Sequence, residues 1–294
     1  DGVTARVGEN EWYMTTTSGG ASRVYSWIQW WLQSGWGDGV HLTQATDGWA
    51  AFNLAGPDSR NVLADLLDES QDAEQISSAS FPYMHVRELA LASIPCRLMR
   101  IGFTGELSYE IHCPAGCGMA LWEAILKAGE AYGIQPFGVE AQRTLRLEKG
   151  HIIVGQDTDA LTNPLMADME WLVKLDKEDF LGQRMLKREA ENGVTEKLVG
   201  FKMISQEFLP EEGLQIVKRV KRSDAYPLGL KILGWVTSAR RSPTLNEIIG
   251  LCWLPKEMAD SPITTFKIRR AGQLLEAKVH HGPFYDADGG RLKG

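Results

Sequence analysis

The chain has 294 residues, of which 44% are apolar and 23% are charged, a composition typical of a globular protein long enough for two domains. Its formal net charge of −7 argues against broad nucleic-acid binding and against a membrane surface, since both need a basic footprint. We therefore expect no nucleic-acid partner and no membrane association. The four irregularly spaced cysteines favour reduced, mostly structural thiols in a cytoplasmic protein.

The first segments predict strands and one amphipathic helix. Residues 11–18 are rich in β-branched and aromatic side chains and predict a strand that ends at a Gly-Gly turn. Between residues 24 and 32, valine, tryptophan, isoleucine and leucine recur at helical spacing and form an apolar stripe. A short strand is predicted within residues 39–47, and a second strand at 49–56 leads into a helix that starts near Pro57.

The middle of the chain continues with strands and then helices. Residues 84–101 alternate well enough to predict two strands around positions 93–95. The stretch GFTGELSYEIHCP, residues 102–114, opens like a turn and continues like a strand. Helices are predicted at about 118–132 and 138–148.

The strand at residues 107–112 contains a glutamate whose surroundings matter. Side chains in a strand alternate between faces, so Ser108, Glu110 and His112 share one face. Glu106 lies in the preceding turn and is expected to be solvated. A carboxylate inside a strand must be paired, hydrogen-bonded to a ligand or exposed. The pattern alone leaves open whether Glu110 faces solvent or a ligand.

The helix predicted at 138–148 carries a second polar cluster. Arg143 and Arg146 lie three residues apart and are neighbours on the helix surface, and Glu140 can pair with Arg143. A surface network of salt bridges is one interpretation. The other is a ligand site, because the helix runs into an apolar segment between glycines, and an arginine there can hold a carboxylate or a planar polar ring. Both interpretations remain open.

From residue 197 onward the sequence changes to short β-rich runs separated by Gly, Pro, Asp or Ser. Many short strands at close spacing predict a small barrel or sandwich. We therefore predict an α+β fold with one domain at residues 1–190 and a second at 191–294. The chain begins without methionine and enters strand-like sequence at once, so we expect a piece of something longer. The sequence contains no P-loop or dinucleotide fingerprint, which argues against hydride or phosphoryl chemistry within it.

Three segments resemble the folate-dependent aminomethyltransferase family, which includes the glycine-cleavage T-protein. GFTGELSYEI, residues 102–111, is similar to the family pattern G-[YF]-T-G-E-x-G-x-E-[IV]. Residues 143–183 resemble R-x-x-L-R-L-E-x-G followed by G-x-D-x-x-x-x-x-P and W-x-V, and residues 237–245 resemble T-S-x-x-x-S-P-x-L. Nearly the whole chain takes part. Within the family the resemblance is strongest to the C-terminal folate domain of the α subunit of heterotetrameric sarcosine oxidase.

The resemblance implies an aminomethyltransferase folate-binding fold, lacking its N-terminal part, with a C-terminal small β-barrel domain. It implies tetrahydrofolate as the cofactor, with flavin and NAD only on missing regions or partner subunits. The implied reaction captures the carbon unit from oxidative demethylation of sarcosine, or of a related N-methyl amine, as 5,10-methylenetetrahydrofolate. Other sarcosine oxidase-type subunits are the implied partners, beside the small amine-derived donor.

The resemblance also assigns roles to four residues. Glu110 matches the glutamate that hydrogen-bonds the pterin ring, and Arg143 matches an arginine of the folate site. Tyr109 is a looser match to a cofactor contact. Asp1 matches a carboxylate beside the reactive nitrogens of tetrahydrofolate and is the expected catalytic residue. No metal is implied, and His112 with its neighbouring cysteines lacks a second ligand pair at zinc-site spacing.

Departures from the family pattern keep alternatives open. Ser108 or its neighbour stands where the family usually has glycine, while Met166 and Asp168 stand where an acidic residue and a glycine are usual. One alternative is a T-protein-like enzyme acting on an aminomethylated lipoyl carrier. Another is a non-catalytic folate-binding or scaffold module. Iron–sulfur-assembly members of that kind carry a cysteine-containing K-G-C-Y-x-G-Q element, whereas this chain reads EKGHIIVGQ.

Overall fold

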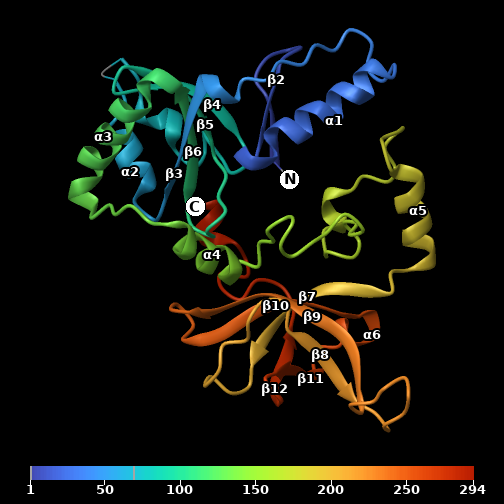
Figure 1. Cartoon of the computed structure of the whole chain (residues 1–294). Coiled ribbons are helices and arrows are strands. Elements are labelled where there is room, and N and C mark those ends of the chain that lie inside the picture. The colour runs from blue at the N-terminus through green and yellow to red at the C-terminus, as the bar shows by residue number, and fades with distance from the viewer. Residues whose placement is uncertain (1, 69) are drawn as a thin grey trace. The chain divides into compact units, whose positions relative to one another are not determined.

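A computed structural model of the chain describes residues 2–68 and 70–294 (Figure 1). The described residues fall into two compact units. We name them the sheet unit, residues 2–137 and 289–294, and the barrel unit, residues 138–288. An antiparallel sheet with helices in one unit and a closed barrel in the other confirm the predicted α+β class.

The sheet unit is built on a four-stranded antiparallel sheet in the order β3-β6-β5-β4. Its strands are β3 (Trp49–Ala55), β4 (Val86–Leu91), β5 (Ile94–Met99) and β6 (Ser108–Pro114). The two strands predicted around positions 93–95 are confirmed as β4 and β5. The two residues that join them, 92 and 93, both have positive φ, as a tight hairpin turn requires.

One face of this sheet carries the hydrophobic core of the unit. It packs against α2 (Ser59–Ala64) and α3 (Gly118–Gly129), which lie on the same side of the sheet in Figure 1. Strand β6 contributes Tyr109 and Ile111, both fully buried. The alternation of β6 therefore sends its large apolar side chains into the core and its polar ones to the other face.

The other face is covered in part by a hairpin of β1 (Gly2–Arg6) and β2 (Trp12–Thr16). Ala5 of the hairpin packs with Met99 and Ile101 at the end of β5, and Tyr13 packs against the same cluster. Because Met99 is the cross-strand partner of Glu110, the hairpin lies on the face of the sheet that carries this glutamate.

The predicted amphipathic helix is confirmed as α1 (Ala21–Gln33), although none of its residues is buried. Its tryptophans, with Trp36 beyond it, form edge-to-face ring contacts. The strand predicted within residues 39–47 is wrong. Residues 40–45 have no regular structure and pair with no strand in the described chain, and an isolated extended segment lacks the ladder that stabilises a strand.

The last helix of the chain, α7 (Gly290–Lys293), belongs to the sheet unit. The fully buried guanidinium of Arg100 donates from Nη1 to the carbonyl of Leu292 and from Nη2 to that of Lys293, both at 3.0 Å. Leu292 is itself buried. These contacts attach the C-terminal residues to the end of β5.

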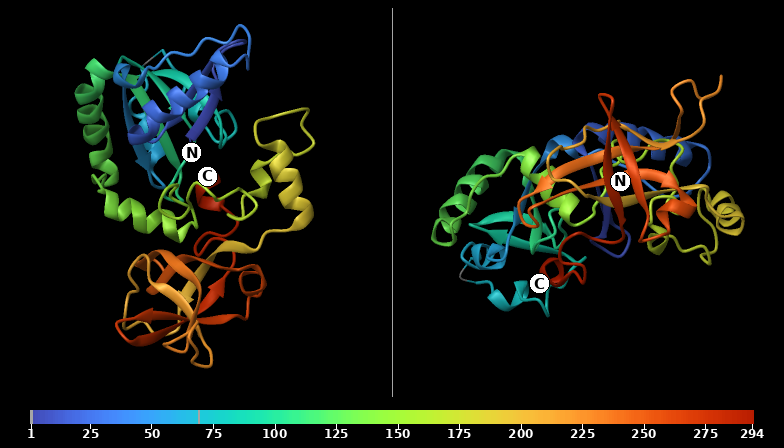
Figure 2. Two further views of the ribbon diagram at one scale, coloured as in Figure 1. Left: turned by 45° about the vertical axis from the view of Figure 1, so that its right-hand side comes forward. Right: turned by 90° about the horizontal axis from the view of Figure 1, so that it is seen from below.

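The barrel unit confirms the predicted small barrel (Figure 2). Six antiparallel strands close in the order β10-β7-β12-β11-β8-β9. They are β7 (Glu196–Met203), β8 (Gln215–Arg219), β9 (Leu230–Ser242), β10 (Glu247–Pro255), β11 (Thr265–Arg270) and β12 (Gln273–His280). The interior is filled by Phe201, Ile216, Val236, Ile248 and Ile268, all fully buried.

Closure of the barrel brings backbones close together at glycines. A Cβ atom on Gly234 would lie 1.9 Å from the carbonyl oxygen of Trp253, and one on Gly250 would lie 2.4 Å from the carbonyl oxygen of Ser238. Neither strand could approach its neighbour in this way with a side chain at these positions.

Helix α4 (Val139–Glu148) belongs to the barrel unit, where it contacts β9 and β10. The unit also contains α5 (Gln183–Asn192) and α6 (Lys256–Ala259). Short 3-10 turns lie at Ser18–Gly20, Thr46–Gly48, Ala73–Ile76, Ala115–Cys117, Glu130–Tyr132 and Glu170–Leu172. The division between the two compact units lies at 137/138, and the contacts of α4 agree with it. The domain boundary at 190/191 was predicted from the change in sequence composition and stays a prediction.

Candidate functional site

Glu110 lies in the middle of β6 with its side chain 37% exposed. Its cross-strand partner on β3 is Asn53, which donates from Nδ2 to the hydroxyl of Ser108 at 3.0 Å. This places Asn53, Ser108 and Glu110 together on one polar strip of the sheet. The predicted alternation of β6 is therefore observed, and Glu110 is on the face opposite the core.

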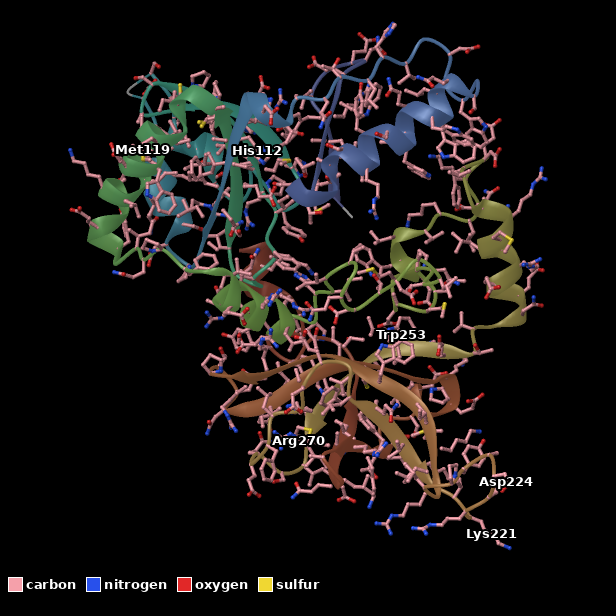
Figure 3. The ribbon with its side chains drawn as sticks, in the orientation of Figure 1. His112, Met119, Lys221, Asp224, Trp253 and Arg270 are labelled. Carbon is pink, nitrogen blue, oxygen red and sulfur yellow. The ribbon has the colours of Figure 1, made fainter. Side chains whose placement is uncertain are left out.

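His112 shares this strip and is nearly buried, with 7% of its side chain exposed. Its Nε2 atom lies 3.5 Å from Oε2 of Glu110, and its Nδ1 atom lies 3.0 Å from the hydroxyl of Tyr13. Figure 3 labels His112 on the sheet. Among the described residues His112 is the hydrogen-bond partner of Glu110, so the second carboxylate oxygen, Oε1, has no partner there.

Arg97 on β5 lies beside His112 and Tyr13. It is the cross-strand partner of His112, and its guanidinium lies 4.3 Å from the ring centroid of Tyr13 and 5.2 Å from that of Trp49. Arg97 also pairs with Glu88 at 2.6 Å. Burial raises the pKa of Tyr13, and the charge of Glu110 adds to this while Arg97 opposes it. Tyr13 is therefore a neutral hydroxyl at physiological pH.

The surroundings of Glu106 and Tyr109 differ from those expected from the sequence. Glu106 is 24% exposed and pairs with Arg291 at 3.1 Å, so it is not simply solvated. Tyr109 is fully buried in the core, where its hydroxyl accepts from Nε of Arg60 at 3.1 Å and its ring lies under Arg100. The tyrosine on the Glu110 face is Tyr13. The cofactor role of Tyr109 stays a prediction, and its position offers no surface on that face.

Arg143 lies on α4 in the barrel unit, with 40% of its side chain exposed. Its Nη1 atom donates to Glu140 at 2.9 Å. Glu140 also lies 3.5 Å from Arg240, which pairs with Glu212 at 2.9 Å. Arg143 thus takes part in a surface network of ion pairs, the first of the two interpretations of its sequence. A role in ligand binding stays a prediction.

Arg146, one turn further along α4, forms a buried cluster. It is 1% exposed, and its Nη1 atom donates at 2.6 Å to Asp157, which is fully buried. Asp157 also accepts from the hydroxyls of Thr237 and Ser238 on β9, and its backbone carbonyl accepts from Nε1 of Trp253 at 2.9 Å. Desolvation lowers the pKa of Arg146 while Asp157 opposes this. The cluster links two of the sequence motifs.

The barrel unit contains a pocket of about 280 Å³ beside the segment that follows α4. Its lining includes Trp171 and Asp168 but not Arg143. Asp168 has φ +59°, so the position where glycine is usual does adopt the left-handed conformation. The two lysines of the lining are already paired, Lys149 with Asp286 and Lys197 with Asp260.

Several sequence expectations concern other chemistry. Asp1, the expected catalytic residue, lies outside the described residues, so its role stays a prediction. Cys96, Cys113 and Cys252 are buried, and burial raises the pKa of Cys96 to about 12. Within residues 2–68 and 70–294 no group of three metal-ligating side chains comes together. No helix in this part of the chain is long and apolar enough to span a membrane.

Sequence reasoning singled out Glu110 and placed His112 on the same face by alternation, but it did not predict their contact. Tyr13 carries no signal in the sequence, since its contact depends on how the β1–β2 hairpin packs on the sheet. The same is true of Asp157, whose burial depends on the fold of the segment after α4.

Two family models match the chain. Residues 1–177 match the GCVT N-terminal domain, and residues 196–286 match the glycine cleavage T-protein C-terminal barrel domain. The second match coincides with the six strands of the barrel unit, and the first covers more than half of the chain.

Similar proteins belong to the same family. The sarcosine oxidase subunit alpha of Corynebacterium sp. (strain U-96) is 38% identical over 302 residues, which include all of this chain and 30% of that protein. The chain thus spans about three tenths of the length of the sarcosine oxidase subunits it matches. The aminomethyltransferase of Chlorobium limicola is 32% identical over 97% of this chain and 73% of that protein.

The fold points the same way. The crystal structure of glycine cleavage system aminomethyltransferase T from Bartonella henselae matches with a TM-score of 0.79 and 22% identity, over 97% of this chain and 72% of that one. This likeness establishes a shared fold. Together with the two domain matches and the relatives, it shows that the chain belongs to the glycine cleavage T-protein family of aminomethyltransferases.

Proposed function

We propose that this chain carries out tetrahydrofolate-dependent one-carbon transfer. The observation that supports the proposal most directly is Glu110, a partly exposed carboxylate on a polar strip, whose Oε1 atom has no partner among the described residues. The chain's resemblance to aminomethyltransferases supplies the reaction class.

The carboxylate of Glu110 has the chemistry that a folate ring needs. The pterin ring presents N–H groups along one edge, and an ionised carboxylate with spare acceptor capacity binds such donors strongly. Glu110 would hold the ring in one orientation, which positions the reacting nitrogens. Arg143 would bind a ligand oxygen, and Asp1 would stabilise positive charge or remove a proton near the nitrogens. Bound tetrahydrofolate supplies the nucleophilic nitrogens that take up the carbon unit.

The donor is the finer part of the proposal. We infer that the carbon unit comes from oxidative demethylation of sarcosine or a related N-methyl amine and leaves as 5,10-methylenetetrahydrofolate. The similarity to sarcosine oxidase alpha subunits supports this donor, with flavin and NAD bound elsewhere in a multisubunit enzyme. Similarity to aminomethyltransferases favours a second candidate, transfer from an aminomethylated lipoyl carrier.

The site is tested by calorimetric titration with tetrahydrofolate under reducing conditions. We expect the chain to bind, and Glu110→Ala to weaken binding by about 10- to 100-fold, because a hydrogen bond to a charged group is lost. Glu106→Ala is the matched control, since this glutamate lies in the turn and pairs with Arg291. Equal affinity of Glu110→Ala and wild type would refute the site.

The donor is tested by product formation. In the complete oxidase assembly, sarcosine should yield 5,10-methylenetetrahydrofolate in amounts that fall with Glu110→Ala. If only an aminomethylated lipoyl carrier gives this product, the second candidate is the function. Folate binding without this product from either donor would indicate a binding or scaffold module.

A further inference from the structure

We propose that His112 is a positioning residue that holds Glu110 for its ligand by donating Nε2–H to Oε2, in a tautomer that Glu110 and the hydroxyl of Tyr13 together favour. This rests on the proposed function only for the identity of the ligand. The arrangement itself is carried by two contacts of one buried ring, 3.5 Å to Glu110 and 3.0 Å to Tyr13.

The neighbours of His112 select one of its three protonation states. If Nδ1 carried the only proton, the lone pair of Nε2 would point at the carboxylate, which can only accept. The doubly protonated ring would place a charge in a nearly buried position, which burial disfavours. The remaining state has Tyr13 donating to Nδ1 and Nε2–H donating to Glu110, so that both ring nitrogens have a partner.

The surroundings of Tyr13 favour the same direction of donation. Its ring contacts the His112 ring edge-on, with centroids 5.5 Å apart, and the guanidinium of Arg97 lies over its face. The charged groups around the pair are thus Arg97 and Glu88, which neutralise each other in an ion pair, and Glu110 itself. A phenol held in this way remains protonated and donates to the nearest acceptor, which is Nδ1.

His112 is more deeply buried than Glu110, so its contact comes from the protein side of the carboxylate. The His112 side chain is 7% exposed, whereas that of Glu110 is 37% exposed. A fixed donor beneath the carboxylate engages Oε2 and leaves Oε1 for a ligand on the open side. The 3.5 Å separation is long for a hydrogen bond, and such contacts in ligand-free sites often tighten when the ligand binds.

The tautomer is tested without any folate. In protein labelled with ¹⁵N-histidine, long-range ¹H–¹⁵N spectra at neutral pH should show His112 as the neutral Nε2–H form. Tyr13→Phe removes the donor to Nδ1, and we expect His112 to become a mixture of states in that variant. A wild-type His112 protonated at Nδ1, alone or together with Nε2, would overturn the proposal.

The consequence for binding is tested by two substitutions that separate the contacts. His112→Gln keeps an amide N–H within reach of Glu110, whereas the shorter His112→Asn can reach only the Tyr13 side. We expect His112→Asn to weaken tetrahydrofolate binding by about tenfold and His112→Gln to restore most of the loss. The exposed His85→Asn should bind like wild type, and circular dichroism should show that all variants are folded.

The outcomes distinguish this proposal from the proposed function. If wild type binds no tetrahydrofolate, the function is refuted, while the tautomer measurement still decides the arrangement of His112. If wild type binds and His112→Asn binds equally well, the positioning role is refuted and the function stands. Equal losses in His112→Gln and His112→Asn would also refute it, since a merely structural histidine predicts no rescue.

Discussion

Two glutamates of the family motifs, Glu110 and Glu148, differ in how their carboxylates are satisfied. Glu148 is 3% exposed and accepts hydrogen bonds from the hydroxyls of Ser242 and Thr244. Its acceptor capacity is used within the barrel unit, so it stabilises the fold. Glu110 is 37% exposed, with His112 as its partner among the described residues. Among the described residues, Glu148 thus has more hydrogen-bond partners than Glu110, which keeps one carboxylate oxygen unpaired.

His280 makes the stability of the barrel unit depend on pH. The ring of His280 stacks on Phe284 with centroids 4.6 Å apart, and its Nε2 atom lies 3.2 Å from the carbonyl oxygen of Pro283. Burial lowers the pKa of His280 below its ordinary value of 6.5, although the Pro283 carbonyl opposes this. Lys202 and His281 lower it further, and Glu247 raises it.

The pH dependence has a definite sign. Below pH 6.5 the unfolded chain takes up a proton at His280 that the folded protein does not, so the free energy of unfolding decreases as the pH falls. We expect wild type to lose more stability between about pH 7.5 and 5.5 than His280→Gln. Because the ring is only half-buried, the difference should be on the order of 1 kcal/mol or less. Urea denaturation measures it, and an identical pH profile for His280→Gln would contradict the prediction.

At the scale of elements, α4 and β9 are joined by the buried pair of Arg146 and Asp157. Asp157→Asn should lower the free energy of unfolding by about 3–5 kcal/mol, because it leaves the buried guanidinium without a counter-charge. Urea denaturation followed by circular dichroism measures this. Arg143→Met, on the same helix, removes only a surface pair with Glu140 and should change stability by less than about 1 kcal/mol.

A double substitution separates the charge from the packing. Arg146→Met with Asp157→Leu removes both charges, and we expect it to recover much of the loss caused by Asp157→Asn. A double variant as unstable as the sum of the two single variants would show that the hydrogen bonds to Ser238 and Thr237, and not the ion pair, stabilise the link.

The sequence pattern alone predicted most of the strands. The strands β4 to β6 and β7 to β12 were found because side chains repeat every second residue and turn residues separate the runs. The strand within residues 39–47 was wrong, because pattern does not show whether a neighbouring strand is present. The face of β6 that carries Glu110 was predicted correctly from alternation, while the ligand role of Glu110 stays a prediction. Tyr13 was missed because a side chain 99 positions away in sequence meets His112 only after the hairpin packs.

At the scale of the whole molecule, the sheet unit contains both the first and the last residues of the described chain. After the barrel is complete, residues 289–294 return to the sheet unit. A Cβ atom on Gly102 would lie 3.0 Å from the side chain of Leu292, so the motif turn and the C-terminal helix are in close contact. The sheet unit is therefore assembled from two segments that are distant in sequence, and its stability should depend on the last few residues.

Deletion of residues 289–294 tests this dependence. The deletion removes both carbonyl acceptors of the fully buried Arg100 and the buried Leu292, and we expect it to destabilise the sheet unit by about 3–5 kcal/mol. Hydrogen exchange should become faster in β4 to β6 and remain unchanged in β7 to β12, since the barrel has its own core. Leu292→Ala keeps both backbone carbonyl acceptors of Arg100 and so separates their loss from the loss of the buried Leu292 side chain. Unchanged exchange in β5 and β6 after the deletion would show that Arg100 finds other acceptors and that the sheet unit is complete without its C-terminal segment.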